Sequence, residues 1–388
     1  MKIASRLVAF VLLWSMLWSA AAVPEPSHGP DPEALTGELV LSPPGQPVRR
    51  LSLSDALHEL KIPAVGIALI DRGELAWVRA FGDQAGPDLL YQAASLSKFV
   101  TAVGVLRLVQ EGRLELDRDV NAYLTSWHIP DSPLARNHPV TLRGLLSMTA
   151  GIGVPGFTGY VPGSPIPTLR EILAGEPPAN SPPVTVIAVP GTSYAYSGGG
   201  YEIIQAVIED VTGAAFPTAM RELVLGPLEM TDSRFAQPLP AEMAVRAAKG
   251  HYQDGRELPG GWRIIPELAA GGLWSTPTDL AKLLIEIGHA YRGEPSRLLS
   301  QETVRGMLIR QPPGPYGLGP AVNGSGASLV MMKRGQNIGY QTFFILFPAS
   351  GQGMVVMTGS DNGTTLANAL VRKAAEAYGW PPLVDLID

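Results

Sequence analysis

The amino-acid sequence predicts an α+β fold, in which an antiparallel sheet is flanked by helices and carries an inserted, mainly helical subdomain. Strand-like segments lie near both ends of the sequence, and helix-like segments fill its middle. The simplest assembly of this pattern is one sheet built from both ends, because a sheet must bury a face against another layer. The 388 residues allow one large domain or two ordinary ones, and a hydrophobic content of 46% supplies a sizeable core.

Strand patterns are clearest in two regions. Val65, Ile67 and Leu69 alternate with smaller residues and are followed by the turn residues Asp71-Arg72-Gly73, which predicts a hairpin. The C-terminal region has three further apolar runs and then a helical pattern. We expect strands at residues 329–333, 341–347 and 353–359, and a closing helix at 367–378.

The middle of the chain predicts three helices. Residues 95–110 are apolar on both sides of a helical pattern, so this helix should be buried. A second stripe runs from Ile203 to Val211 and stops at Gly213. A third begins at Thr276, with proline at its first position. Residues 151–191 are rich in proline and glycine, which is typical of a linker or of an ordered loop at the rim of a site.

The first 22 residues resemble an export signal. Lys2 and Arg6 precede an apolar run at residues 7–18, and Ala20-Ala21-Ala22 offers small residues for cleavage. A membrane anchor is the alternative, but the run is short for a span. We therefore expect a periplasmic or secreted protein with no stable membrane span after signal removal.

Domain boundaries follow from these patterns. Residues 23–48 are Pro-rich and lack periodicity, which predicts a tail. Residues 49–388 are then the folded domain, with an α/β part at about 49–92 and 320–388 and a helical part at about 93–319.

Composition excludes several kinds of site. The chain has no cysteine, which rules out disulfides, thiolate catalysis and cysteine-based metal sites. Its six histidines show no H-x-H or H-E-x-x-H spacing, so a zinc site is not expected. The net charge is −6 without a Lys/Arg cluster, which disfavours nucleic-acid binding. We expect no metal or organic cofactor, and a small-molecule or peptide substrate.

Two serines are candidates for a nucleophile, and the first is Ser197. Its surroundings, Tyr194 to Tyr201 (YAYSGGGY), differ by one residue from the G-x-S-x-G of a nucleophile elbow. An elbow serine follows a buried strand and needs a histidine within reach. Here the turn sequence Pro190-Gly191-Thr192-Ser193 precedes it and the last histidine is His289, so this context does not favour Ser197.

The better candidate is Ser95, because Ser95 and Lys98 form the only S-x-x-K pattern in the chain. On a helix this spacing places the hydroxyl and the amine on one face. At a helix start, free N–H groups and the helix dipole favour a developing oxyanion. Burial or a second cation would lower the lysine pKa and let the amine accept a proton. The alternative is an N-capping serine beside a solvated lysine.

Several segments, in order, resemble the penicillin-recognising serine hydrolases, which include class C β-lactamases, DD-peptidases and S-x-x-K esterases. Ser95-x-x-Lys98 is similar to their first motif, and Lys333-Arg334-Gly335 with Gly339-Tyr340 is similar to the third, K-T-G. Further similarity covers residues 108–117, 140–151, 190–201 and 271–280. The resemblance extends over most of the mature chain and implies the two-part β-lactamase/transpeptidase-like fold.

The resemblance also implies roles for individual residues. Tyr196 matches the first residue of the second motif, Y-x-N, and would be the general base or proton shuttle. Lys98 and Lys333 would stabilise its phenolate. Lys333, Gly335 and Gln336 would bind substrate, and the backbone N–H groups of Ser95 and Gln336 would form an oxyanion hole. The alternatives are a core or rim tyrosine at 196 and a charged edge strand at 333–335.

The chain departs from the family pattern at Gly198, where the family has asparagine. That asparagine can hydrogen-bond the catalytic lysine and the amide of a β-lactam or peptide side chain, and glycine cannot. Lys333, in contrast, follows the β-lactamase and DD-peptidase form, and many related esterases have a different residue at this position.

We expect an exported serine acyl-hydrolase that forms an acyl-enzyme with β-lactam, ester or D-amino-acid peptide carbonyls. The alternative is a catalytically slow or idle penicillin- or peptidoglycan-binding envelope protein.

Overall fold

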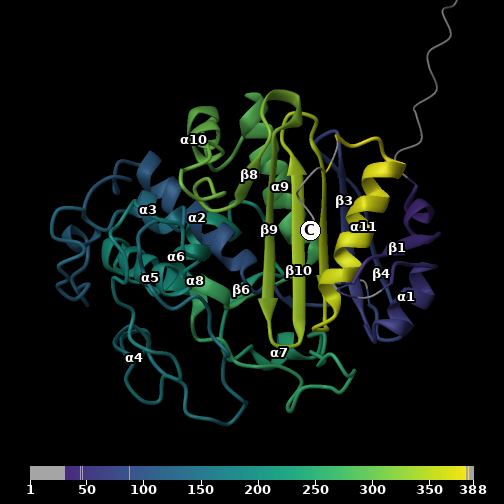
Figure 1. Cartoon of the computed structure of the whole chain (residues 1–388), viewed down its shortest axis with the longest axis horizontal. Coiled ribbons are helices and arrows are strands. Elements are labelled where there is room, and N and C mark those ends of the chain that lie inside the picture. Colours follow the sequence, from purple (N-terminus) through teal and green to yellow (C-terminus); the bar gives the residue numbers. More distant parts are fainter. Residues whose placement is uncertain (1–30, 44, 46, 87, 382, 384–388) are drawn as a thin grey trace, which may run out of the picture.

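The computed structural model describes residues 31–381 and 383, except 44, 46 and 87. Its central element is a six-stranded antiparallel sheet in the order β4-β3-β11-β10-β9-β8 (Figure 1). The N-terminal hairpin lies beside the C-terminal strands, as the sequence predicts. The strands are β3 (Val65–Asp71), β4 (Glu74–Phe81), β8 (Ala321–Asn323), β9 (Val330–Asn337), β10 (Tyr340–Phe347) and β11 (Gln352–Thr358).

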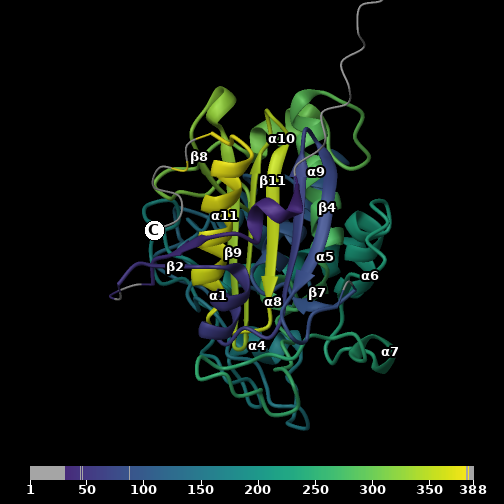
Figure 2. The ribbon, with the colours of Figure 1, turned by 90° about the vertical axis from the view of Figure 1, so that its right-hand side faces the viewer.

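Helices cover both faces of this sheet. α11 (Gly363–Ala377) packs on one face and α9 (Pro277–Arg292) on the other, as the two views show (Figures 1 and 2). Alternate residues of a strand point to opposite faces. On β10, Phe343 and Ile345 accordingly join the core that contains the buried residues of α11, whereas Phe344 and Leu346 join the core that contains those of α9. The central strands are therefore buried on both faces, which explains their continuous apolar runs.

The middle of the chain forms a helical region beside the sheet. Its predicted central helix is α2 (Leu96–Gln110), which is buried along most of its length. Three short strands form a separate small sheet in the order β5-β7-β6. The remaining elements here are α3 (Leu142–Leu146), α4 (Leu169–Ala174), α5 (Gly199–Thr212), α6 (Phe216–Met220), α7 (Ala241–Ala244), α8 (Leu268–Gly271), α10 (Gln301–Met307), β5 (Tyr91–Gln92), β6 (Arg234–Phe235) and β7 (Leu273–Ser275).

The described part of the expected N-terminal tail is packed against the domain. β1 (Leu39–Leu41) pairs with β2 (Arg49–Leu51), and α1 (Leu53–Glu59) follows. Leu35, Leu39 and Leu41 are fully buried in the core that contains the buried residues of α11. A short Leu-x-Leu alternation among prolines is a weak strand signal, so the sequence did not reveal it. The predicted signal, residues 1–22, lies outside the described residues, and no helix within them is long and apolar enough to span a membrane.

A close backbone approach holds the start of α2 against the sheet. Gly335 on β9 pairs with Thr342 on β10, and the Thr342 hydroxyl donates a 2.9 Å hydrogen bond to the Ala93 carbonyl. A Cβ added to Gly335 would lie 2.7 Å from that carbonyl oxygen and 3.0 Å from the backbone nitrogen of Ser95. Only glycine lets β9 lie this close to the residue that begins α2.

We predict that Gly335→Ala lowers the free energy of unfolding by about 1–3 kcal/mol, because the added methyl group must displace backbone atoms. Urea unfolding followed by circular dichroism measures this change. Gly306→Ala is the matched control, because Gly306 lies on α10 with no atom within 4 Å of an added Cβ. That control should raise stability by up to ~1 kcal/mol. Equal stability of the Gly335 variant and wild type would contradict the tight contact.

Candidate active site

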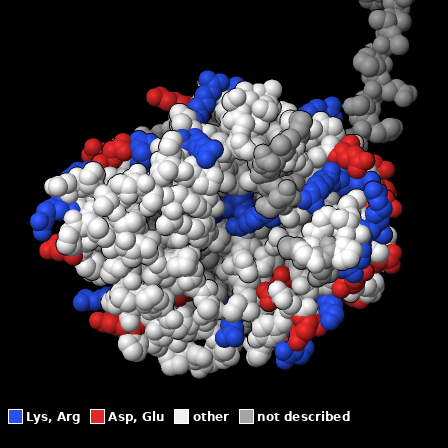
Figure 3. Space-filling model, in the orientation of Figure 1, with Lys and Arg blue, Asp and Glu red and all other residues white. Residues whose placement is uncertain are grey.

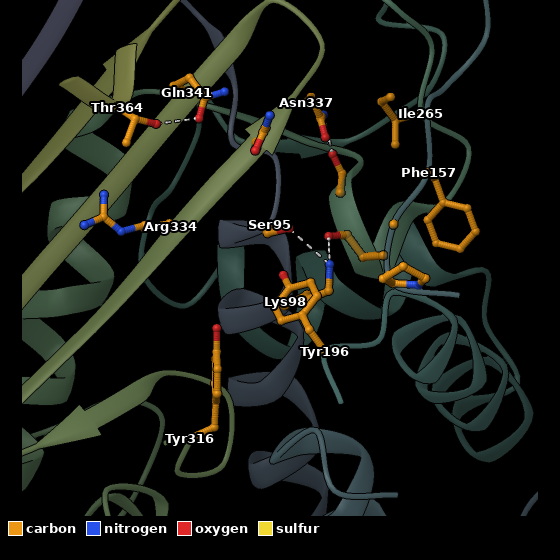
Figure 4. A pocket seen from close by; sticks show the side chains of 15 residues that line it. Ser95, Lys98, Phe157, Tyr196, Ile265, Tyr316, Arg334, Asn337, Gln341 and Thr364 are labelled. Carbon is orange, nitrogen blue, oxygen red and sulfur yellow. Dashed lines mark hydrogen bonds between the residues drawn. The ribbon is translucent and has the colours of Figure 1, made fainter. Parts of the chain in front are cut away.

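A cavity of about 520 Å³ opens where the start of α2, the segment before α5 and the edge of β9 meet. Figure 3 shows the face of the molecule seen in Figure 1, with scattered charges and a basic group near its middle. Figure 4 shows the cavity from close by. The lining residues are Ser95, Lys98, Pro155, Gly156, Phe157, Tyr196, Ile265, Ala270, Gly271, Tyr316, Arg334, Gln336, Asn337, Gln341 and Thr364.

Ser95 and Lys98 lie on one face at the start of α2, as their spacing predicts. Ala94 has a left-handed backbone conformation with φ of 50°, which turns the chain sharply before Ser95. The Lys98 ammonium donates hydrogen bonds to Ser95 Oγ at 3.2 Å and to the Ala270 carbonyl at 2.7 Å. Lys98 is only 2% exposed, and within the described chain the Ser95 hydroxyl makes no capping bond to α2. The alternative of an N-capping serine beside a solvated lysine is therefore wrong.

Tyr196 lies between two buried ammonium groups. The Nζ atoms of Lys98 and Lys333 are 5.3 and 5.4 Å from the centre of its ring. Lys333 is 1% exposed, and its ammonium has no hydrogen-bond partner among the residues that the structure describes. It also lies 4.7 Å from the ring centre of Tyr316. The phenol at 196 thus faces two positive charges that solvent barely screens.

These charges change the acidity of the site. Burial alone raises the pKa of Tyr196, but the charge of Lys333, then that of Lys98, and hydrogen bonding by Ser95 and Lys98 lower the pKa to about 7. Burial lowers the pKa of Lys333 to about 8, although the Tyr196 phenolate opposes this shift. The arrangement places a hydroxyl beside a phenolate that forms near neutral pH, so the Ser95 proton has an acceptor.

The register of β9 bears on the backbone N–H groups of Ser95 and Gln336, which the family resemblance implies as an oxyanion hole. The hairpin β9–β10 closes with a two-residue turn, and Gln336 pairs with Gln341 one step from that turn. In such a ladder the pair beside the turn is hydrogen-bonded and the next pair is not. The Gln336 N–H therefore points away from β10, toward the open edge of β9. Gly335 places this edge against the backbone nitrogen of Ser95.

A buried carboxyl pair, Glu202 and Glu267, lies behind Lys98, and no motif or spacing in the sequence predicts it. Glu202 on α5 accepts a 3.1 Å hydrogen bond from the backbone N–H of Ala270, whose carbonyl holds Lys98. Glu202 and Glu267 are both 0% exposed. Burial raises the pKa of Glu267 to about 7 and that of Glu202 well above its ordinary value, with a further increase from Glu267. Glu202 thus supports the α8 turn that accepts the lysine, whereas neither carboxyl oxygen of Glu267 has a hydrogen-bond partner among the described residues.

The structure places the predicted site residues in two groups. Ser95, Lys98, Tyr196 and Gln336 line the cavity. Lys333 and Gly335 lie behind its wall, because Lys333 points between two tyrosines and Gly335 packs on the Ala93 backbone.

Ser197 has a structural role in the segment before α5. Its hydroxyl donates to the Gly153 carbonyl at 2.8 Å and accepts from the Gly200 N–H at 2.9 Å, and the residue is 4% exposed. The structure thus agrees with the sequence context that disfavours Ser197. In the described part of the chain, no group of three or more His, Cys, Asp or Glu side chains is placed to hold a metal.

Sequence reasoning missed most of the cavity wall. Arg334, Gln341 and Thr364 lie on one side of Ser95, and Phe157 and Ile265 on the other (Figure 4). Arg334 is inside the third motif, so its position was a usable signal. Phe157 comes from the Pro/Gly-rich residues 151–191, of which Pro155, Gly156 and Phe157 line the cavity; the range also contains α4.

Comparisons with known proteins agree with this geometry. The Beta-lactamase family model matches residues 52–378. Penicillin-binding protein 4 of Amycolatopsis lactamdurans is 29% identical over 274 residues, which cover 66% of this chain and 68% of that protein. Protein flp of Staphylococcus aureus (strain N315) is 26% identical over 236 residues, and the alignment spans 57% of this chain but only 43% of that relative.

A solved structure supports the fold. The octameric penicillin-binding protein homologue from Pyrococcus abyssi superposes with a TM-score of 0.69 at 24% identity, covering 86% of this chain and 77% of that one. The family match covers most of the chain, and the motifs of its sequence meet in one cavity. The chain therefore belongs to the β-lactamase family.

Proposed function

We propose that this protein is an exported serine acyl-hydrolase that works through an acyl-enzyme on Ser95. The observation that carries the proposal is the 3.2 Å contact between Ser95 Oγ and the buried Lys98 ammonium, beside a tyrosine whose pKa is about 7. Export rests on the sequence of residues 1–22, with its basic start, apolar run and three alanines.

The proposed reaction has two halves. Tyr196 phenolate takes the Ser95 proton as Oγ forms a bond to the substrate carbonyl carbon. The Ser95 and Gln336 N–H groups stabilise the oxyanion, a contribution that typically amounts to about 3–4 kcal/mol for one donor. The bond to the leaving group then breaks, and Tyr196 returns the proton to that group. In the second half water replaces Ser95 at the carbonyl by the same steps in reverse order.

Lys98 and Lys333 have different parts in this scheme. Lys98 orients the Ser95 hydroxyl and is itself held by the Ala270 carbonyl. Lys333 lies out of the cavity, so its charge acts on Tyr196 rather than directly on substrate. Arg334 lines the cavity and supplies the cation for an anionic substrate group, in the role first expected of Lys333.

The proposed substrates are esters, with β-lactams and D-amino-acid peptides as the other carbonyl classes that this chemistry serves. Gly198 favours esters, because it offers no side chain to bond a substrate amide. A second candidate function is slow penicillin binding without turnover. The 29% identity to a protein named penicillin-binding protein 4 favours it.

We predict that Ser95→Ala lowers ester turnover by about 10³-fold or more and abolishes labelling by a serine-reactive phosphonate. Ser197→Ala is the control, because that hydroxyl bonds only to backbone groups. Intact protein mass spectrometry should show one phosphonate adduct on wild type and on the control. An adduct on the Ser95 variant together with none on the Ser197 variant would overturn the assignment.

The pH dependence follows from the two shifted groups. The base must be deprotonated, so kcat/KM should rise with pH through about 7. Lys333→Met removes a cation beside Tyr196, which raises the pKa of the phenol and moves the rising limb to higher pH. Lys61→Met, at an exposed lysine away from the cavity, should leave the profile unchanged. An unmoved rising limb in Lys333→Met would show that Tyr196 is not the titrating base.

Parallel kinetics with three substrates tests the reaction class. We expect kcat/KM for a short-chain p-nitrophenyl ester to exceed that for nitrocefin and for a D-Ala-D-Ala peptide by about tenfold or more, because no side chain at 198 binds an amide. Mass spectrometry after addition of a penicillin follows the acyl adduct over time. A persistent adduct with no turnover of any of the three substrates would instead support the penicillin-binding function.

A further inference from the structure

The glycine of the second motif is covered by an aromatic ring. A Cβ added to Gly198 would lie 2.9 Å from Cε2 of Phe157 and 3.3 Å from both Cδ2 of Phe157 and the Pro155 carbonyl oxygen. Carbon atoms in favourable contact are ~3.5–4.0 Å apart. The ring of Phe157 thus occupies the space that any side chain at position 198 would enter. Asparagine at 198 and the present position of Phe157 exclude each other.

The loop that carries Phe157 is fixed to the start of α5. Ser197 Oγ donates to the Gly153 carbonyl at 2.8 Å, Gly199 N–H to the Val154 carbonyl at 2.9 Å, and Gly198 N–H to the Pro155 carbonyl at 3.2 Å. Val154 has a left-handed backbone with φ of 60°, which is rare for a β-branched residue and persists only when its surroundings enforce it. Three successive hydrogen bonds therefore hold the backbone that precedes the ring.

Phe157 gives the cavity two chemically different sides. Phe157 and the nearly fully buried Ile265 line one side, whereas Arg334, Gln341 and Thr364 line the other, with Ser95 between them (Figure 4). Gln341 already bonds Thr364 at 2.9 Å, and Arg334 donates to Asn368 at 2.8 Å. Arg334, Gln341 and Thr364 thus lie on the side away from Phe157.

We propose that Phe157, seated on Gly198, forms an apolar subsite that selects acyl groups without an amide next to the reacting carbonyl. The subsite lies where the family resemblance places the contact between residue 198 and an acyl-side amide. An amide against the Phe157 ring loses water without gaining a partner, which is unfavourable. The preferred substrates are then esters of short alkyl or aromatic acids. This inference rests on the proposed function, because it requires an acyl-enzyme on Ser95.

The test compares two esters that differ only in the acyl chain. p-Nitrophenyl pentanoate and p-nitrophenyl N-acetylglycinate have the same chain length and leaving group, and each kcat/KM is divided by the rate of uncatalysed hydrolysis. Wild type should prefer the pentanoate by about 10- to 100-fold. Phe157→Ala should reduce this preference by about tenfold, and Phe157→Ala/Gly198→Asn should reverse it. Phe81→Ala, at a half-buried ring on β4 outside the cavity, is the matched control and should leave the preference unchanged.

Thermal unfolding gives a second readout that does not depend on activity. Gly198→Asn alone should lower Tm because the new side chain meets the ring, and adding Phe157→Ala should restore most of that loss. Equal Tm effects of Gly198→Asn with and without Phe157 would overturn the steric coupling. An unchanged ester preference in Phe157→Ala and in the double variant would overturn the subsite.

Labelling with a small methylphosphonate separates failure of the inference from failure of the proposed function. If wild type and the Phe157 variants are labelled on Ser95 but share one ester preference, Ser95 is the nucleophile and the proposed apolar subsite is wrong. If wild type is not labelled and hydrolyses neither ester, the proposed function itself is wrong, and the subsite with it.

Discussion

The site depends on two ammonium groups that are buried around one phenol. Burying a charge costs several kcal/mol unless a partner compensates it. Lys98 has two hydrogen-bond acceptors, Ser95 Oγ and the Ala270 carbonyl, whereas in the described chain the Lys333 ammonium has none. The negative form of Tyr196 is therefore the principal compensation available to Lys333. The same interaction brings the pKa of Tyr196 down to about 7, so the burial of Lys333 makes the Tyr196 phenol more acidic and its phenolate available near neutral pH.

The fold brings these groups together from distant parts of the chain. Lys98 lies on α2, Tyr196 just before α5, and Lys333 on β9. The sheet built from both ends of the chain places β9 at the helical region, and Gly335 lets it approach the start of α2. A glycine with no chemistry of its own thus sets the distance between the strand edge and Ser95. Glu202 holds the opposite wall, since its carboxyl group fixes the α8 turn that accepts Lys98.

The sequence predicted the helices and strands whose apolar residues are regularly spaced, and the site residues that lie in motifs. The hairpin at Val65–Phe81, the buried helix at Leu96–Gln110 and the three C-terminal strands all have regular apolar spacing, and they are found as expected. Ser95, Lys98 and Tyr196 lie in ordered motifs and meet in one cavity. Phe157 lies in an irregular loop, and its contact with Gly198 depends on the path of the backbone, which no spacing encodes. Lys333 lies beside Tyr196, as the family resemblance implies, but the motif alone did not show that its ammonium is buried and does not line the cavity.

The substitution at position 198 separates catalysis from recognition. By the family resemblance, an asparagine here would serve both the lysine and a substrate amide. Lys98 does not need it, because Ser95 and the Ala270 carbonyl accept its hydrogen bonds and the Tyr201 ring lies 5.6 Å from its Nζ atom. The substrate amide has no such replacement, since the ring of Phe157 fills the vacated space. The lysine, tyrosine and serine thus keep their contacts without a side chain at 198, and the ring of Phe157 makes this part of the cavity wall apolar. On the proposed function, this wall would alter which acyl groups bind without altering the reaction.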